Sequence, residues 1–286
     1  MPMLSHSPLG ALRAAVRMPR SFRGSPRARE RSRMSESRHR APARLWAVGL
    51  LSLVLLGCAS APSPQAVSSP DAVLAPFAEA ERDLRAQVGG RLYRLDAEAS
   101  QLRIHVFRAG RAAALGHNHV LSAPQLRGLL WWPLNEQALP QPRGGSEARF
   151  ELQLRLDELL LDPPELRAAL GPGWASVLSP EAVAATRRNM LGEQGLQAER
   201  FPELRIQGLS LIGEPPKLIG RWRLSLHGVT RTVEVPLHVD LSADQVRVTG
   251  AWVLRQSDFG LQPFSVAGGL LAVQDELLVE FDLRGR

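Results

Sequence analysis

The chain has 286 residues, a formal net charge of +7 and a single cysteine. The positive charge lies in residues 1–44, which hold eleven arginines and two acidic residues, and this leaves 24 basic and 26 acidic residues in 45–286. A nucleic-acid interface needs basic residues clustered on the folded part of a protein, and residues 45–286 contain no such cluster. The charge distribution therefore excludes nucleic acid as a partner. The single cysteine excludes an intrachain disulfide bond.

Residues 1–57 are predicted to be a basic arm followed by a lipoprotein signal peptide. An uncharged apolar run, 45–56, follows Arg44, and it is too short for a transmembrane helix, which needs about 20 residues. The next residues complete the sequence Leu55-Leu56-Gly57-Cys58, which resembles the lipobox of bacterial lipoproteins. We expect Cys58 to be lipidated, although an ordinary signal peptide with an incidental cysteine stays open. Either Met1 or Met34 could be the translation start.

Residues 58–90 are expected to form a lipidated, flexible tether with a short helix at its end. Small residues and prolines dominate 59–73, a composition typical of linkers. A helix is expected over 74–88, with its apolar positions at Leu74, Phe77, Leu84 and Val88. Because no aspartate follows Cys58, the resemblance to sorted Gram-negative lipoproteins implies a periplasmic protein anchored to the outer membrane.

From Arg91 onward the apolar pattern has a period of two, which indicates strands with one buried face. The clearest examples are Leu102–Val106, Phe150–Leu156, Trp222–Leu226, Val233–Leu241 and Leu277–Leu283. Many such strands predict an all-β sandwich or barrel. Two segments interrupt the pattern and predict short helices, about 163–171 and 179–191. The second has Ser179 as its N-cap, Pro180 in its first turn and Gly192 as its C-cap.

Several stretches of 91–286 resemble the YceI-like family of periplasmic, polyisoprenoid-binding-like proteins. The most specific is the hairpin sequence Leu224-Ser-Leu-His-Gly-Val-Thr-Arg231. The others are Tyr93–Asp96 with Ser100–Ile104, the turn Gly116-His-Asn-His-Val120, Arg188–Leu191 with Phe201–Ile206, and the loop Ser257-Asp-Phe-Gly-Leu261.

This resemblance implies an antiparallel, lipocalin-like β-barrel domain over residues 91–286 with an elongated apolar interior. It also implies a long apolar ligand, such as a polyisoprenoid, an isoprenoid quinone or an acyl amide. The chain departs from the simplest members in its predicted lipid anchor and in its Gly-His-Asn-His turn, which marks a subgroup. The turn leaves the identity of the ligand open.

The residues singled out as candidate ligand contacts are His117, Asn118, His119 and His227. His117 and His119 are two residues apart on an extended segment, so they would point to the same side. Structural hydrogen bonding, contact with a ligand head group, and metal binding are all open for this pair. Zinc normally needs three or four protein ligands, so a metal site would need help from elsewhere in the chain. His227 precedes Gly228 at a tight hairpin, where bracing the turn or an adjacent loop is the simpler role.

Three functions are compatible with these features. The first is a non-enzymatic, membrane-anchored protein that binds an apolar lipid. The second is a metal-dependent enzyme using His117 and His119. The third is a non-catalytic envelope stress or scaffold protein. The sequence favours the first, and it indicates no catalytic residue, no cofactor and no resident metal.

Overall fold

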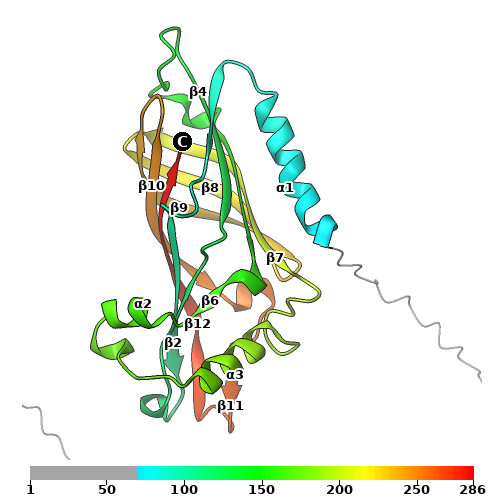
Figure 1. Ribbon diagram of the computed structural model, residues 1–286, viewed down its shortest axis with the longest axis vertical. Helices are drawn as coiled ribbons and strands as arrows, with labels where there is room; N and C mark the ends of the chain where they lie inside the picture. Colours follow the sequence, from blue (N-terminus) through cyan, green and yellow to red (C-terminus); the bar gives the residue numbers. More distant parts are fainter. Residues whose placement is uncertain (1–69) are drawn as a thin grey trace, which may run out of the picture. The chain divides into compact units, whose positions relative to one another are not determined.

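Residues 70–286 are described in the computed structural model, with side chains from Phe77 onward (Figure 1). The predicted signal peptide, the tether and Cys58 lie outside the described residues. Twelve strands form one antiparallel sheet: β1 (Gly90–Arg94), β2 (Gln101–Ala109), β3 (His119–Ser122), β4 (Arg127–Pro133), β5 (Arg149–Arg155), β6 (Leu160–Leu161), β7 (Glu203–Glu214), β8 (Lys217–Leu226), β9 (Val229–Leu241), β10 (Val246–Arg255), β11 (Ser265–Val266) and β12 (Leu271–Gly285).

Alternation of apolar and polar residues decides which face of each strand is buried. In β8 the even-numbered residues Leu218, Trp222 and Leu224 are buried, whereas the odd-numbered residues from Lys217 to Arg223 are exposed. Successive strand side chains point to opposite faces, so one face of this sheet collects the apolar residues and the other meets water. The core lies inside the curved sheet.

The sheet closes on itself at one end. Its strands follow the order β1-β4-β5-β7-β8-β9-β10-β12, and Arg94 and Arg286 then exchange backbone hydrogen bonds of 2.8 and 3.0 Å across the seam. An isolated bridge between Leu95 and Gly285 extends this pairing. The period-two pattern is compatible with both a sandwich and a barrel. Because the seam joins the first and last strands of this order, the fold is a barrel. The expected all-β fold with few helices is confirmed.

At the other end β2 replaces β1 as the neighbour of β12, and β3 and β6 continue the sheet. The side of the barrel next to β6 is covered by α3 (Pro180–Leu191). Arg187 of α3 donates hydrogen bonds to the carbonyls of Asp157 and Leu159, and Met190 packs on the core. Helix α3 thus forms part of the wall around the interior.

The structure contains both of the helices that the sequence predicts between the strands. Ser179 caps α3 by accepting a 3.2 Å hydrogen bond from the Ala182 N–H, and the Gly192 N–H bonds the Arg188 carbonyl. Helix α2 (Pro164–Ala169) begins one residue later than expected.

Helix α1 (Pro70–Arg85) begins and ends earlier than expected. Its residues Phe77 and Leu84 pack on Leu129 and Trp131 outside the barrel. Val88 was expected on the apolar face of this helix, but it lies past the helix end and is 89% exposed. Within residues 70–286, no helix has the length and apolar character needed to cross a bilayer.

Candidate functional site

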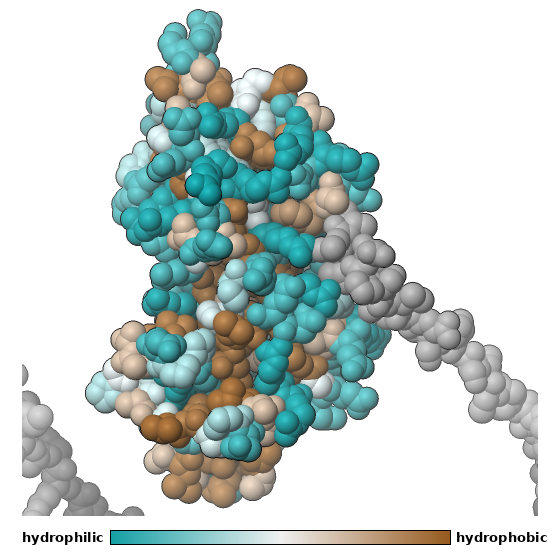
Figure 2. Space-filling view, viewed as in Figure 1, coloured by the Kyte–Doolittle hydropathy of each residue, from teal (hydrophilic) through white to brown (hydrophobic). Residues whose placement is uncertain are grey.

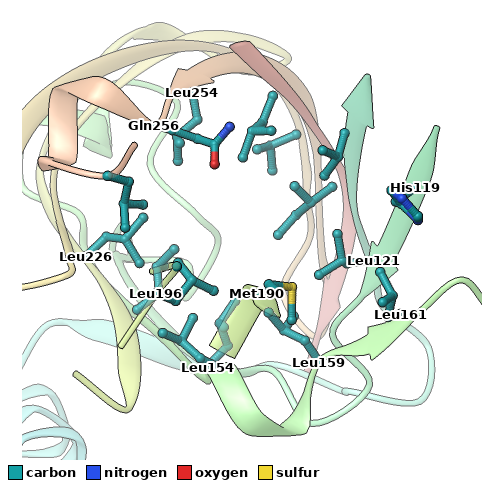
Figure 3. Close-up of a pocket in the computed structure, with 18 of the residues that line it drawn as sticks. His119, Leu121, Leu154, Leu159, Leu161, Met190, Leu196, Leu226, Leu254 and Gln256 are labelled. Atoms are coloured by element: carbon teal, nitrogen blue, oxygen red, sulfur yellow. The ribbon is translucent and has the colours of Figure 1, made fainter. Parts of the chain in front are cut away.

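The interior of the barrel holds a cavity of about 250 Å³ next to α3 (Figure 3). Most of its lining side chains are apolar, and Figure 3 shows several of them pointing inward from different strands, including Leu121, Leu154, Leu226 and Leu254. Among the described lining residues there is no lysine, arginine, aspartate or glutamate. Such a wall suits a hydrocarbon chain, because burying an unpaired charge there would carry a large free-energy penalty.

A second cavity of about 90 Å³ lies at the seam end of the barrel, where Leu95, Arg284 and Gly285 are among its lining residues. Leu102, Leu152, Ile206 and Trp252 line both cavities, so the two are neighbours inside one barrel. Strand alternation produces this interior directly. Leu102, Ile104 and Val106 of β2 face the larger cavity, whereas His105 between them lies outside, against Trp174 and Glu280.

The mouth of the larger cavity is the part lined by the exposed residues Asn189, Gln194, Gln262 and Phe264. Polar side chains are concentrated here, while the deeper wall is made mainly of leucine, isoleucine and valine. A long ligand with one polar end could place that end at the mouth and its chain inside.

A chain of four aromatic rings lines the smaller cavity, and one of them, Trp252, also lines the larger cavity. Phe150, Trp222, Trp252 and Phe281 meet edge to face, with ring centroids 5.6, 5.9 and 5.7 Å apart. The indole nitrogens of Trp222 and Trp252 are buried and have no hydrogen-bond partner among the described residues. Buried N–H groups normally find an acceptor, so two unpaired indoles in one interior need an explanation.

His119 is the one member of the Gly116–Val120 turn that lines the cavity. Its Nδ1 lies 2.6 Å from Oδ2 of Asp162, and its side chain is 16% exposed. Asp162 is fully buried and also accepts 3.0 and 2.7 Å hydrogen bonds from the Val120 N–H and from Arg167. The carboxylate fixes the ring, and among the described residues Nε2 of His119 has no hydrogen-bond partner.

His117 and Asn118 brace the turn rather than the cavity. His117 Nδ1 lies 3.0 Å from the Ser176 hydroxyl, which also accepts a 2.9 Å hydrogen bond from Arg167. Asn118 joins two segments, because its Oδ1 accepts from the Arg108 N–H and its Nδ2 donates to the Gly173 carbonyl. Arg167 also donates to the Asn118 carbonyl. The turn and segment 162–176 are thus fastened together.

Charge and burial move two pKa values in this network. Burial raises the pKa of Asp162, but the hydrogen bonds from His119, Val120 and Arg167 outweigh that effect and hold its pKa below the ordinary range. The pKa of His117 is lowered, first by desolvation and then by the nearby His119, Arg167 and Arg108. Both shifts favour an ionised Asp162 and a neutral His117 at neutral pH.

His227 lies at the two-residue hairpin between β8 and β9. His227 and Gly228 have φ values of +53° and +74°, the pattern of a type I′ turn. The His227 ring packs against Phe201, and its Nδ1 lies 3.1 Å from the Phe259 carbonyl. His227 does not line the cavity, but it holds the 256–262 loop, whose residues Leu261 and Gln262 do.

The predicted ligand contacts therefore occupy different places. His119 lies at the cavity wall, and His117, Asn118 and His227 support the surrounding segments, so ligand contact by the four residues stays a prediction. Cys58 lies outside the described residues. Within residues 70–286, no three histidine, cysteine, aspartate or glutamate side chains lie together in a way that could hold a metal ion.

Sequence reasoning missed Asp162, Arg167 and the two buried indoles. Asp162 has a φ of +53°, which aspartate tolerates better than most residues, and it stands before Pro163 and Pro164. That is a turn signal, and nothing in it points to His119, which is 43 residues away in the chain. Alternation predicts that the two indoles lie on the inner face of the barrel. It cannot predict that their N–H groups lack hydrogen-bond acceptors within the described part of the chain.

Comparison with known proteins supports the family resemblance over part of the chain. Residues 175–284 match the YceI-like domain. This region includes the Leu224–Arg231 hairpin and the Ser257–Leu261 loop, whereas the Gly116–Val120 turn lies outside it. No curated protein matched the chain.

Two solved proteins are structurally similar to the chain at low sequence identity. BcnA of Burkholderia cenocepacia is 12% identical with a TM-score of 0.46, and the match covers 67% of this chain and 99% of BcnA. The YCEI protein of Campylobacter jejuni is 6% identical with a TM-score of 0.37, and the match covers 58% of this chain and 84% of that protein.

Proposed function

We propose that this protein is a non-enzymatic lipid-binding protein of the bacterial envelope, which holds a long apolar ligand inside its barrel. The observation that carries the proposal is a leucine-rich cavity of about 250 Å³ whose described lining residues include no lysine, arginine, aspartate or glutamate, and which adjoins a second, largely apolar cavity. At about 250 Å³ the larger cavity is slightly smaller than the usual range of about 300–1,000 Å³ for small-molecule sites.

The interior also bears on the class of ligand. A polyisoprenoid, an isoprenoid quinone and an acyl amide all supply a long apolar chain. Trp222 and Trp252 present unpaired donors at the wall of the smaller cavity, and a ligand carbonyl oxygen there would satisfy one of them. A phosphate would be badly placed against the wall of the larger cavity, which has no lysine or arginine, whereas the smaller cavity has one arginine, Arg284, at its lining. These features favour a neutral ligand that carries a hydrogen-bond acceptor.

The location proposed for this activity is the periplasmic face of the outer membrane, with Cys58 as the lipidated anchor. Support comes from the order of the basic arm, the apolar run and the single cysteine. An anchored barrel would sequester or carry its ligand close to the bilayer from which the ligand is taken.

The first test is the lipid content of protein purified from its own membranes, measured by organic extraction and mass spectrometry. We expect roughly one apolar molecule per wild-type chain. Val106→Phe should lower this content severalfold, because the larger ring fills space in the cavity wall.

Val253→Phe is the matched control, since Val253 lies on β10 and is 59% exposed. It makes the same chemical change outside the barrel and should leave the lipid content unchanged. A folded wild-type protein that consistently carries no lipid would overturn the proposal. Equal lipid in both variants would remove the larger cavity as the site.

A further inference from the structure

Two loops form a joint tip at the mouth end of the barrel. One follows β2 and covers residues 110–116, and the other runs through β11 into β12 and covers residues 264–271. Backbone N–H groups of Arg111 and Ala112 donate to the carbonyls of Gly269 and Leu270, at 3.3 and 2.9 Å. These bonds hold the two loops as one unit, here called the tip. Figure 1 shows β11 at the lower end of the view.

The tip exposes apolar side chains that the core does not use. Leu115 is 75% exposed, Phe264 46%, Val266 40% and Leu270 40%. Figure 2 shows apolar residues gathered at this lower end of the molecule. Contiguous exposed apolar surface of this kind marks a site of contact with another protein or a membrane.

The two tip loops carry charges of one sign, and the next acidic residues along β12, Asp275 and Glu276, are paired with Ser257 and Arg255. Residues 108–118 contain Arg108 and Arg111, and neither this stretch nor 260–273 contains an aspartate or a glutamate. Both arginines are exposed. Apolar side chains flanked by arginines, with no carboxylate between them, complement a bilayer that displays anionic head groups.

The tip is also continuous with the cavity. Phe264 belongs to the tip and lines the mouth of the larger cavity. An apolar ligand that left a bilayer through this mouth would pass along apolar side chains and avoid contact with water.

We propose that the tip docks on the surface of an anionic lipid bilayer and brings the cavity mouth against the lipid. A protein partner is the less favoured occupant, because exposed arginines beside apolar side chains, with no carboxylate in the two loops, complement an anionic lipid surface. The inference rests on the proposed function for what passes through the mouth, while the docking itself rests on the tip alone.

The test places a single fluorescent label on the full-length protein, expressed and processed in its host and reconstituted into phosphatidylethanolamine–phosphatidylglycerol vesicles. A label at Val266→Cys reports on the tip. A label at Ile219→Cys reports on an exposed position near the β7–β8 hairpin, at the other end of the barrel. Lipids that carry a quencher near the head group should quench the tip label at least about threefold more strongly than the hairpin label. Equal quenching at the two positions would overturn the docking proposal.

A second measurement removes apolar surface from the tip without touching the cavity wall. Val266→Ser/Leu270→Ser should slow ligand transfer from vesicles by about tenfold or more, because two aliphatic side chains can then no longer be buried in the apolar part of the bilayer. Ile212→Ser/Ile219→Ser removes the same kind of surface from the β7–β8 hairpin and should leave the rate unchanged. Arg111→Gln should reduce the preference for anionic over neutral vesicles.

Lipid content is measured in the same samples, which separates the two proposals. Tip variants that still contain lipid but transfer it slowly would support docking. Unchanged transfer in Val266→Ser/Leu270→Ser would count against docking even if the barrel is full of lipid. Preferential quenching at the tip of a barrel that never carries lipid would leave docking standing and remove the lipid-binding function.

Discussion

Asp162 joins the Gly116–Val120 turn to the segment that follows β6. It is fully buried, and it accepts hydrogen bonds from His119, Val120 and Arg167. Removing one partner of a buried ion pair leaves the other charge uncompensated, which typically destabilises a protein by about 3–5 kcal/mol. If Asp162 became neutral, the guanidinium of Arg167, whose side chain is only 7% exposed, would be left without its carboxylate partner.

Asp162→Asn is therefore expected to lower the free energy of unfolding by roughly 3 kcal/mol at pH 7, measured by urea denaturation. Asp157→Asn is the control, since Asp157 pairs with Arg155 at the surface and its side chain is 49% exposed. Its effect should stay below about 1 kcal/mol. Equal stability of Asp162→Asn and wild type at pH 7 would show that the network does not hold the turn.

The same carboxylate predicts a dependence on pH. The folded-state pKa of Asp162 is lowered, so its stabilising effect is fully present above the unfolded-state value of about 3.9 and is lost as the pH falls through the folded-state value. The gap in stability between wild type and Asp162→Asn should thus narrow when denaturation is repeated near pH 3. A gap that stays constant from pH 7 to pH 3 would contradict this assignment.

The hairpin between β8 and β9 shows how an element far from the cavity can shape its mouth. His227 Nδ1 approaches the Phe259 carbonyl, and Arg231 donates to the Asp258 carbonyl, so the hairpin holds the 257–260 turn. A Cβ at Gly228 would lie 2.7 Å from the Phe201 ring, whereas a Cβ at Gly260 would meet nothing within 4 Å.

Gly228→Ala and Gly260→Ala make a matched pair, since both glycines have positive φ values, +74° and +70°. Each substitution should cost about 1 kcal/mol of stability for the backbone conformation. Gly228→Ala should cost about 1–3 kcal/mol more, because the Phe201 ring must also move. Urea denaturation of the two variants measures the difference, and equal losses would mean that Phe201 does not constrain the turn.

At this scale the sequence predicts much of what the structure contains. Alternation of apolar and polar residues predicts five strands, namely β2, β5, β8, β9 and β12. The bounds of α3 are predicted by Ser179, Pro180 and Gly192. Both kinds of signal depend only on neighbouring residues in the sequence. The start of α1 and the exposure of Val88 were missed, since no local signal marks where a helix stops packing on a sheet. The contact between His119 and Asp162 joins segments 43 residues apart, so it was also missed. Closure at Arg94 and Arg286 could not be derived from period-two patterning, which suits a sandwich equally well.

For the whole molecule, the barrel and its proposed anchor are separate parts of the chain. Cys58→Ser should abolish incorporation of labelled palmitate and remove the protein from the outer-membrane fraction. Ala59→Asp should keep the palmitate, and by resemblance to sorted lipoproteins it should shift the protein to the inner membrane. Palmitate labelling and density fractionation measure both outcomes. Unchanged labelling in Cys58→Ser would exclude this cysteine as the anchor.

Closure of the barrel at the seam also affects the order in which its parts fold. Ser100 and Arg284 exchange hydrogen bonds between side chain and backbone across 184 residues of sequence, near the seam at Arg94 and Arg286. Contacts between residues so far apart slow folding, because a long loop must be ordered before the contact forms. The seam is therefore expected to be among the later parts of the barrel to assemble.

The barrel contains an intrinsic fluorescent probe of ligand binding. It belongs to the group of edge-to-face aromatic residues Phe150, Trp222, Trp252 and Phe281. Two of its members are indoles, and Trp252 lines both cavities. A bound chain would alter the surroundings of that indole, so its fluorescence would report occupancy without an added dye. The ligand classes would leave different signatures, since a quinone accepts electrons and excitation energy and would quench the emission. A saturated acyl amide can do neither and would only shift its wavelength.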